Sequence, residues 1–473
     1  MQTASLLDHS ALAPDVLAPD ALPARRVFFD LFDGQFGSEE LETAFQFLGE
    51  QLGVASQLDG DLPSEMGGLY AWMEANTAEV GERYRAYLDA RKAGASRRYF
   101  PTKSHALGFI KAVAPTKLVD GAWLYGLLPR WQDPRFAALI ETYLEELGEG
   151  LPTKNHVVLY EKLLASQGIS NWADLSDAHF VQGAIQLSLA YGAERFLPEV
   201  IGFNLGYEQL PLHLLICAYE LKELGIDPYY FTLHITVDNA DSGHAKKAVD
   251  AIFDAVPTLG DADEFYRRVC NGYKLNLLGE STNSVIDAFD LDREITEILT
   301  RKGAIGKFAH SDYREIEGHT VNEWLSDAAQ TREFLGAMEQ EGWFKRHQDP
   351  QLSRFWKLIQ SEKAKMFGVF SAYEQQVIFD WIAGDCAPQF TKTLQAPRLS
   401  SEARQRLFQA ADAHLKRGSN SDFEAEEREL EEKLASAENQ ADEMSKLIAL
   451  MSPAQHHTPA GLMATRLFND VLS

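Results

Sequence analysis

The sequence predicts an all-α protein. From Phe28 onward, apolar residues recur at the three- and four-residue spacing of an amphipathic helix. Runs that alternate apolar and polar residues and are rich in β-branched side chains are scarce. The chain has 473 residues, 45% hydrophobic and 24% charged, which is the composition of a globular protein with two or three structural units.

Helical periodicity is clearest in six segments, which are residues 41–52, 69–93, 136–147, 156–166, 180–191 and 212–224. Tyr229–Val237 fits a buried strand, but it follows Asp227-Pro228 and also reads as the start of a helix. Residues 92–105 and 300–320 are punctuated by glycine or proline and are expected to form ordered loops.

Four regions are expected. Residues 1–25 form a flexible N-terminal arm, 26–270 the main helical domain, 271–420 an additional helical region packed on it, and 421–473 a C-terminal amphipathic helix and tail. Within residues 422–451 apolar residues follow a heptad-like spacing, broken by Glu427. This stripe predicts either a coiled-coil contact in a homodimer or a helix packed on its own chain.

The charge balance excludes some partners. With 44 Lys and Arg against 70 Asp and Glu, the net charge is −26, which argues against nucleic acid and anionic membranes. Cys217, Cys270 and Cys386 are far apart and form no CxxC pair, which fits a reducing compartment. Neither a signal peptide nor an apolar run of ~18 residues is recognised, so we expect a cytoplasmic protein.

Missing motifs narrow the chemistry. The sequence contains no GxSxG elbow, P-loop, complete dinucleotide fingerprint or HExxH. None of the thirteen histidines has Glu three residues before it, which excludes the Glu-x-x-His pairs of ferritin-like diiron bundles.

Three segments instead place imidazoles and carboxylates among apolar residues. In chain order, the candidate metal ligands are Glu146 or Glu149, His156, Glu199, His234, Asp238, Asp241 and His244. A set of mixed imidazole and carboxylate ligands suits non-haem iron or manganese, whereas zinc prefers fewer carboxylates.

Helical spacing supports the third segment. At ~100° per residue, Asp238 lies about 40° and Asp241 about −20° from His234, so the three share one face. His244 falls at the edge of that face, at about −80°, and Ser242-Gly243 could loosen the helix and bring it inward.

The other two segments leave alternatives open. Glycines and a proline separate Glu149 from His156, so Glu146 competes with Glu149 as the first carboxylate. Glu199 stands in an apolar helix and needs a metal, a proton or a cation, and Arg195 is the alternative partner four residues earlier.

At these residues the chain resembles the haem-oxygenase-like diiron oxidase/oxygenase superfamily, the iron-containing redox enzymes, over residues 110–255. The motifs that carry the resemblance are Leu118-Val-Asp120-Gly-Ala-Trp123-Leu124, Glu146 with His156, Pro198-Glu199-x-x-Gly-Phe-Asn-Leu-Gly-Tyr-Glu208, and His234-x-x-x-Asp238 with His244. The resemblance implies a bundle of about seven helices that binds iron rather than haem, with ligands at Glu146, His156, Glu199, His234, Asp238 and His244. One departure is the last histidine, which stands ten residues after His234, while the family's usual offset of seven is occupied by Asp241.

The resemblance also implies an activity. It implies two irons, the second labile, that react with O2 as co-substrate to form a peroxo-diferric species. This species would oxidise a small amine- or carboxylate-bearing metabolite by N-oxygenation or by C–H or C–C cleavage, with an external electron donor as a partner. Arg195 and Arg130 are candidates to hold a substrate carboxylate. The alternatives are a haem-binding or haem-degrading protein on the same fold and a non-catalytic helical interaction protein.

Overall fold

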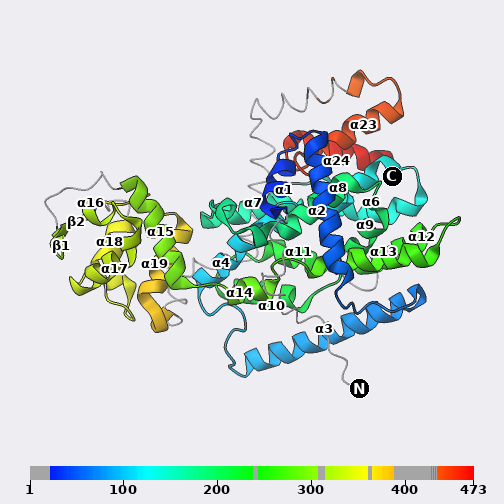
Figure 1. The fold of residues 1–473 in the computed structure, drawn as a ribbon. Coiled ribbons are helices and arrows are strands. Elements are labelled where there is room, and N and C mark those ends of the chain that lie inside the picture. The colour runs from blue at the N-terminus through cyan, green and yellow to red at the C-terminus, as the bar shows by residue number, and fades with distance from the viewer. Residues whose placement is uncertain are drawn as a thin grey trace, which may run out of the picture.

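The computed structural model describes residues 22–237, 243–306, 315–360, 365–387 and 434–472, with residues 428, 430 and 432. Within these residues the secondary structure is helical apart from one two-stranded hairpin, β1 (Glu315–Ile316) and β2 (His319–Thr320). The predicted all-α fold is therefore confirmed (Figure 1).

The larger body of the molecule is built by helices from both ends of the chain (Figure 1). These are α1 (Ala24–Phe32), α2 (Ser38–Ser56), α3 (Leu69–Lys92), α4 (Lys103–Ala112), α5 (Ala114–Lys117), α6 (Ala137–Glu146), α7 (His156–Gln167), α8 (Val181–Gly192), α9 (Leu197–Tyr207), α10 (Leu212–Glu223), α11 (Tyr229–Val237), α12 (His244–Ala255), α13 (Ala262–Lys274), α14 (Thr282–Asp287), α23 (Gln440–Leu450) and α24 (Pro459–Leu472). A 3-10 segment, Ala122–Arg130, packs against α8 in the core, and the long helix α3 lies along one side against α10 and α12.

A smaller body lies to the left in Figure 1. It contains the hairpin and the helices α15 (Leu291–Gly306), α16 (Val321–Trp324), α17 (Thr331–Gln340), α18 (Arg354–Ile359) and α19 (Ala372–Ala383). A buried ion pair between Lys111 Nζ and Glu294 Oε1, 2.6 Å long, joins α4 to α15. The backbone N–H of Ser104 also donates to Asp380 of α19 across 2.8 Å. The two bodies share one apolar cluster, so they pack as neighbours on a common core.

Most of the predicted elements form where expected. The six periodic segments are the helices α2, α3, α6, α7, α8 and α10, and Tyr229–Val237 is the helix α11 rather than a strand. Residues 93–102 form the expected loop before α4. The expected loop at 300–320 is wrong in part, because α15 continues to Gly306 and residues 315–320 form the hairpin; residues 307–314 lie outside the described part. Buried Gly303 continues the four-residue spacing of Ile295 and Leu299, and a glycine inside a helix costs only about 1 kcal/mol.

The predicted continuous helix over residues 422–451 is interrupted. A turn at residues 436–439 precedes α23, and residues 421–427, with Phe423 and Glu427, lie outside the described residues. Leu430, Met444 and Met451 of the apolar stripe are buried in the main core of the same chain. Burial in the same chain supports the alternative of a helix packed on its own protein. The expected boundary at residue 270 also falls inside α13.

Helices α9 and α13 approach each other at two glycines. A Cβ atom on Gly202 would lie 1.9 Å from the carbonyl oxygen of Val269, and one on Gly272 would lie 2.2 Å from that of Glu199. Both distances are far shorter than any real carbon–oxygen contact, so only glycine permits this backbone approach. This close contact of α9 and α13 at Gly202 and Gly272, the glycine seam, fixes the position of α9 and of the residue that follows it, Glu208.

The three cysteines are free thiols, and Cys217 is buried. Among the described helices, none combines the length and apolar character that crossing a membrane would require.

Candidate metal centre

Seven buried or largely buried ionisable side chains meet inside the larger body. Two groups hold ligand atoms within 4.8 Å of one another: Asp120, Glu146, His156 and His234 form one, and Glu146, Glu208 and His244 form the other. The seventh side chain, Glu145, contacts the second group.

Secondary structure explains how these residues converge. Asp120 stands in the turn after α5, Glu146 ends α6, and His156 begins α7. His234 lies inside α11, whereas Glu208 follows the last residue of α9 and His244 is the first residue of α12; these three residues complete the two groups.

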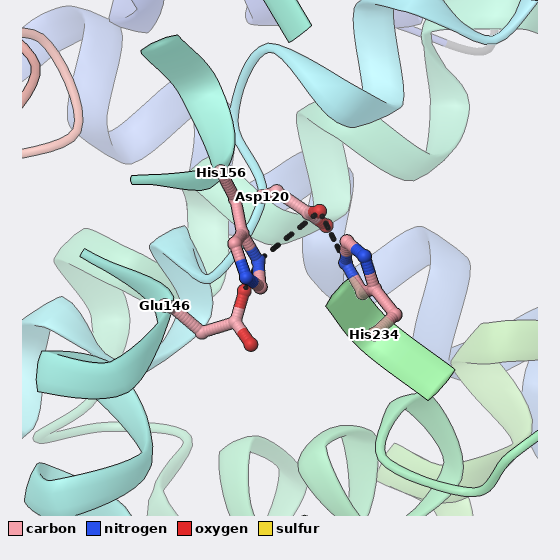
Figure 2. Close-up of side chains that lie close together, drawn as sticks. All are labelled: Asp120, Glu146, His156 and His234. Carbon is pink, nitrogen blue, oxygen red and sulfur yellow. Dashed lines mark hydrogen bonds and ion pairs between the residues drawn. The ribbon is translucent and has the colours of Figure 1, made fainter. Parts of the chain in front are cut away.

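In the first group, the carboxylate of Asp120 lies between two imidazoles (Figure 2). Its Oδ2 atom is 3.1 Å from His234 Nε2 and 3.9 Å from His156 Nδ1, and the two imidazole rings are 4.3 Å apart at their centroids. Glu146 contacts His156 Nδ1 through Oε2 from the opposite side (Figure 2). The donor atoms thus face a common centre.

In the second group, His244 lies between carboxylates. Its Nδ1 atom is 2.8 Å from Glu208 Oε2 and 3.7 Å from Glu146 Oε1. Its Nε2 atom is 2.6 Å from Glu145 Oε2, and Lys247 Nζ also binds Glu145 at 2.9 Å. A carboxylate on the outer ring nitrogen is a common way to orient a metal-ligating histidine. Glu146 is therefore shared by the two groups, one oxygen toward each.

Two of the histidines are arranged to present a ring nitrogen to a metal. His234 Nδ1 lies 2.8 Å from the carbonyl oxygen of Tyr230, which can only accept, so the proton is on Nδ1 and Nε2 faces Asp120. Burial lowers the pKa of His156 to about 4, although the Asp120 carboxylate opposes this. A neutral imidazole keeps a lone pair free for a metal.

Asp120 is held ionised from its outer side. Tyr207 Oη donates to Oδ1 across 2.6 Å, Tyr230 Oη donates to Oδ2, and Lys117 Nζ is 3.5 Å from Oδ1. Burial would raise the pKa of Asp120, but Lys117 and the two imidazoles outweigh it, so the pKa lies below its ordinary value.

The carboxylates repel one another in the metal-free protein. Burial, followed by the charges of Glu208 and Asp120, raises the pKa of Glu146 to about 8. Among the buried atoms of the two groups, Glu208 Oε1 makes no hydrogen bond, and Glu146 Oε2 and His156 Nδ1 make only ion-pair contacts. Carboxylates gathered in a buried site are costly unless a proton or a cation lies between them. These residues therefore fit a metal.

Glu199, predicted as a ligand, is not brought to either group. Its carboxylate accepts two hydrogen bonds from Arg268 of α13, at 2.7 and 2.6 Å. The bidentate guanidinium satisfies the charge that the sequence left unexplained, and this corrects the prediction. Arg195, the alternative partner, lies instead at the surface, 3.5 Å from Glu42.

Of the other predicted residues, some lie away from the site and two lie outside the described part of the chain. Glu149 is exposed, with φ at +54°, and pairs with Lys154 at 3.0 Å, so Glu146 is the carboxylate that reaches the site. Arg130 lies over the ring of Phe136, and neither it nor Arg195 belongs to either group, so neither predicted substrate contact is supported. The predicted ligands Asp238 and Asp241 lie outside the described residues.

His244 reaches the site because the helix is broken before it. Helix α12 begins at His244, and the backbone of its N-cap Gly243 is extended rather than helical. The angle of about −80° between His244 and His234 assumed one continuous helix. Because the helix is interrupted, that angle does not apply, and His244 can reach the site.

Asp120 and Glu208 were not predicted as ligands. Both stand in the motifs that carry the family resemblance, at the centre of residues 118–124 and at the end of residues 198–208. Two signals could have identified them: a carboxylate among apolar residues in each motif, and for Glu208 its place at a helix end beside Tyr207.

Residues 107–276 match the family model described as iron-containing redox enzyme. This span contains every member of both groups. Comparison with curated proteins and with solved structures finds no significant match. This part of the chain is thus similar to the iron-containing redox enzymes, an all-α, haem-oxygenase-like family.

Proposed function

We propose that the protein binds two iron ions, one in each group, and uses them for O2-dependent oxidation of a small molecule. The observation that carries the proposal is the shared carboxylate of Glu146, which turns one oxygen to each of two buried sets of ligands. Two adjacent sets with a common carboxylate suit a pair of metal ions better than a single one.

The ligands favour iron. The first ion would be held by Asp120, His156, His234 and Glu146, and the second by Glu146, Glu208 and His244. Three carboxylates and three imidazoles match non-haem iron, and no cysteine is among them. When bound, ferrous iron supplies the electrons and the open coordination positions with which dioxygen reacts.

The protein contributes orientation and protection. Tyr207 and Tyr230 hold Asp120, and the carbonyl of Tyr230 fixes His234, so the first group needs little rearrangement to receive an ion. Asp120, Glu146 and His156 are each at most 3% exposed, which keeps bulk water away from the reacting centre.

We further propose that the substrate is a small amine- or carboxylate-bearing metabolite that undergoes N-oxygenation or oxidative C–H or C–C cleavage. The family resemblance supports this class, and an external electron donor would return the irons to the ferrous state. Binding of haem is disfavoured, because the free nitrogens of His156 and His234 face carboxylates rather than an apolar slot.

The test is anaerobic loading with Fe(II), followed by measurement of iron per chain and of O2 uptake. We expect about two irons per chain, O2 consumption, and a transient visible band with the right member of a panel of amino and fatty acids. His234→Ala should lose iron, whereas the exposed control His319→Ala should behave as the wild type. Wild-type protein that takes up no iron, or that shows a Soret band with haem, would overturn the proposal.

A further inference from the structure

The C-terminal segment, outside the matched region, packs on the loop that separates two metal ligands. This loop, residues 147–155, joins Glu146 to His156. Tyr143 Oη donates to the carbonyl of Met451 across 2.6 Å, and Arg466 Nη1 donates to that of Gly150 across 3.1 Å. The loop and the helix before it, α6, are therefore both bonded to a part of the chain about 300 residues further on.

The side chain of Asn155 connects the C-terminal segment to the metal centre. Its Oδ1 atom accepts from the backbone N–H of Val158 at 3.1 Å and so caps α7, whose first residue is His156. Its Nδ2 atom donates to the carbonyl of Leu147 at 3.2 Å, directly after Glu146. One fully buried amide thus sets the spacing between the two ligand-bearing segments.

His456 reinforces the orientation of that amide. Its Nδ1 atom lies 3.1 Å from Asn155 Nδ2, and its side chain is only 2% exposed. Burial lowers the pKa of His456 well below its ordinary value, so the ring is neutral and Nδ1 accepts from the amide. With the amide reversed, Oδ1 would face this lone pair, and Val158 would lose its acceptor.

We propose that His456 is a positioning residue of the metal centre, which acts through Asn155 to fix Glu146 and His156 at the distance that metal binding requires. The proposal rests on the proposed function for its metal-binding consequence. It adds a residue from the C-terminal segment to a site whose ligands all lie in residues 107–276. The C-terminal segment would then be part of the working site.

Three variants separate positioning from folding. His456→Leu removes the acceptor, His456→Asn restores one near the position of Nδ1, and His457→Ala is the neighbouring control. Fe(II) affinity is measured by anaerobic equilibrium dialysis, with the visible spectrum of bound Co(II) as a second readout. Exchange of the amides in the first turn of α7 is followed by mass spectrometry in metal-free protein.

We expect His456→Leu to bind Fe(II) about tenfold more weakly, at the lower end of the loss seen for outer partners of metal ligands, and to shift the Co(II) spectrum. Amides of residues 156–160 should exchange about fivefold faster, as expected for a lost helix cap. His456→Asn should recover both properties, and His457→Ala should keep them.

The proposal is overturned if His456→Leu exchanges at the wild-type rate, whether or not the wild type takes up iron. It is also overturned if the wild type binds iron and His456→Leu binds it equally well, in which case the proposed function stands. Failure of the wild type to bind iron removes the proposed function, and exchange alone then decides the role of His456. If His456→Leu does not fold, Asn155→Ser decides, because serine keeps the helix cap but not the hydrogen bond to His456. Unchanged Fe(II) affinity in Asn155→Ser would refute the positioning role. If the wild type does not bind iron, unchanged amide exchange in residues 147–150 would refute it.

Discussion

Replacing Glu146 with Gln should have opposite effects on stability and on metal binding. The folded protein raises the pKa of this carboxyl from 4.5 to about 8, through burial and then the charges of Glu208 and Asp120. In the metal-free protein at pH 7, keeping the group protonated costs about 3 kcal/mol relative to the unfolded chain, where it is ionised. Glutamine is neutral and similar in shape, so Glu146→Gln should raise the free energy of unfolding by up to about 3 kcal/mol at pH 7.

The sign follows from linkage. Because the folded pKa of Glu146 lies above the unfolded one, its contribution to stability is present below pH 4.5 and is lost as the pH rises through about 8. The gain from Glu146→Gln should therefore vanish at pH 4, grow as the pH rises from 4.5 to 8, and level off above pH 8. Denaturant unfolding in the presence of a chelator, at three pH values, measures it.

Metal binding should change in the other direction. Glu146 offers one oxygen to each group, so its loss should weaken the binding of both ions. The affinity should fall by more than the roughly 10–100-fold that is lost when a hydrogen-bond partner of a metal ligand is removed. Glu149→Gln, three residues away and exposed, is the control and should change stability by less than about 0.5 kcal/mol. A Glu146→Gln protein that is less stable without metal, or that still binds two irons, would refute this reasoning.

Three further predictions follow from the same geometry. His244→Ala should keep one iron in the Asp120 group, while Asp120→Asn should keep one in the other; equal loss of both ions in His244→Ala would contradict two separate positions. Iron affinity should fall about tenfold per pH unit below the pKa of Glu146, because the proton competes with the metal, and a flat titration between pH 6 and 8 would contradict this. Arg268→Leu should destabilise the protein by about 2–3 kcal/mol by leaving buried Glu199 unpaired, without changing iron per chain, since this pair lies outside both groups.

Most of the fold could be predicted from the sequence. The main helices were predicted correctly because each packs one apolar face on the core of the same chain. Apolar residues therefore recur at three- and four-residue spacing along these segments. The end of α15 was missed because its two glycines predict a loop, whereas Gly303 is buried on the same helix face as Ile295 and Leu299. The turn inside residues 422–451 was hidden, because apolar residues continue the heptad spacing across it.

The site was predictable only where residues share an element or a motif. His156, His234 and Glu146 stand in recognisable local patterns, and the structure brings them together. Glu199 also carried such a pattern, but its partner Arg268 comes from a helix about 70 residues later, and spacing within one segment cannot reveal that. Glu208 enters the site through the path of α9 across the core, which is a property of packing.

The glycine seam between α9 and α13 has a consequence for mutational tolerance. Gly202 and Gly272 allow the two backbones to touch, and Glu208 follows the end of α9. A single added methyl group at either glycine would push α9 outward and carry Glu208 with it, although neither glycine bears a functional group. Random mutagenesis should therefore find that alanine at Gly202 or Gly272 inactivates the protein, although neither glycine has a side chain that could bind a metal or a substrate.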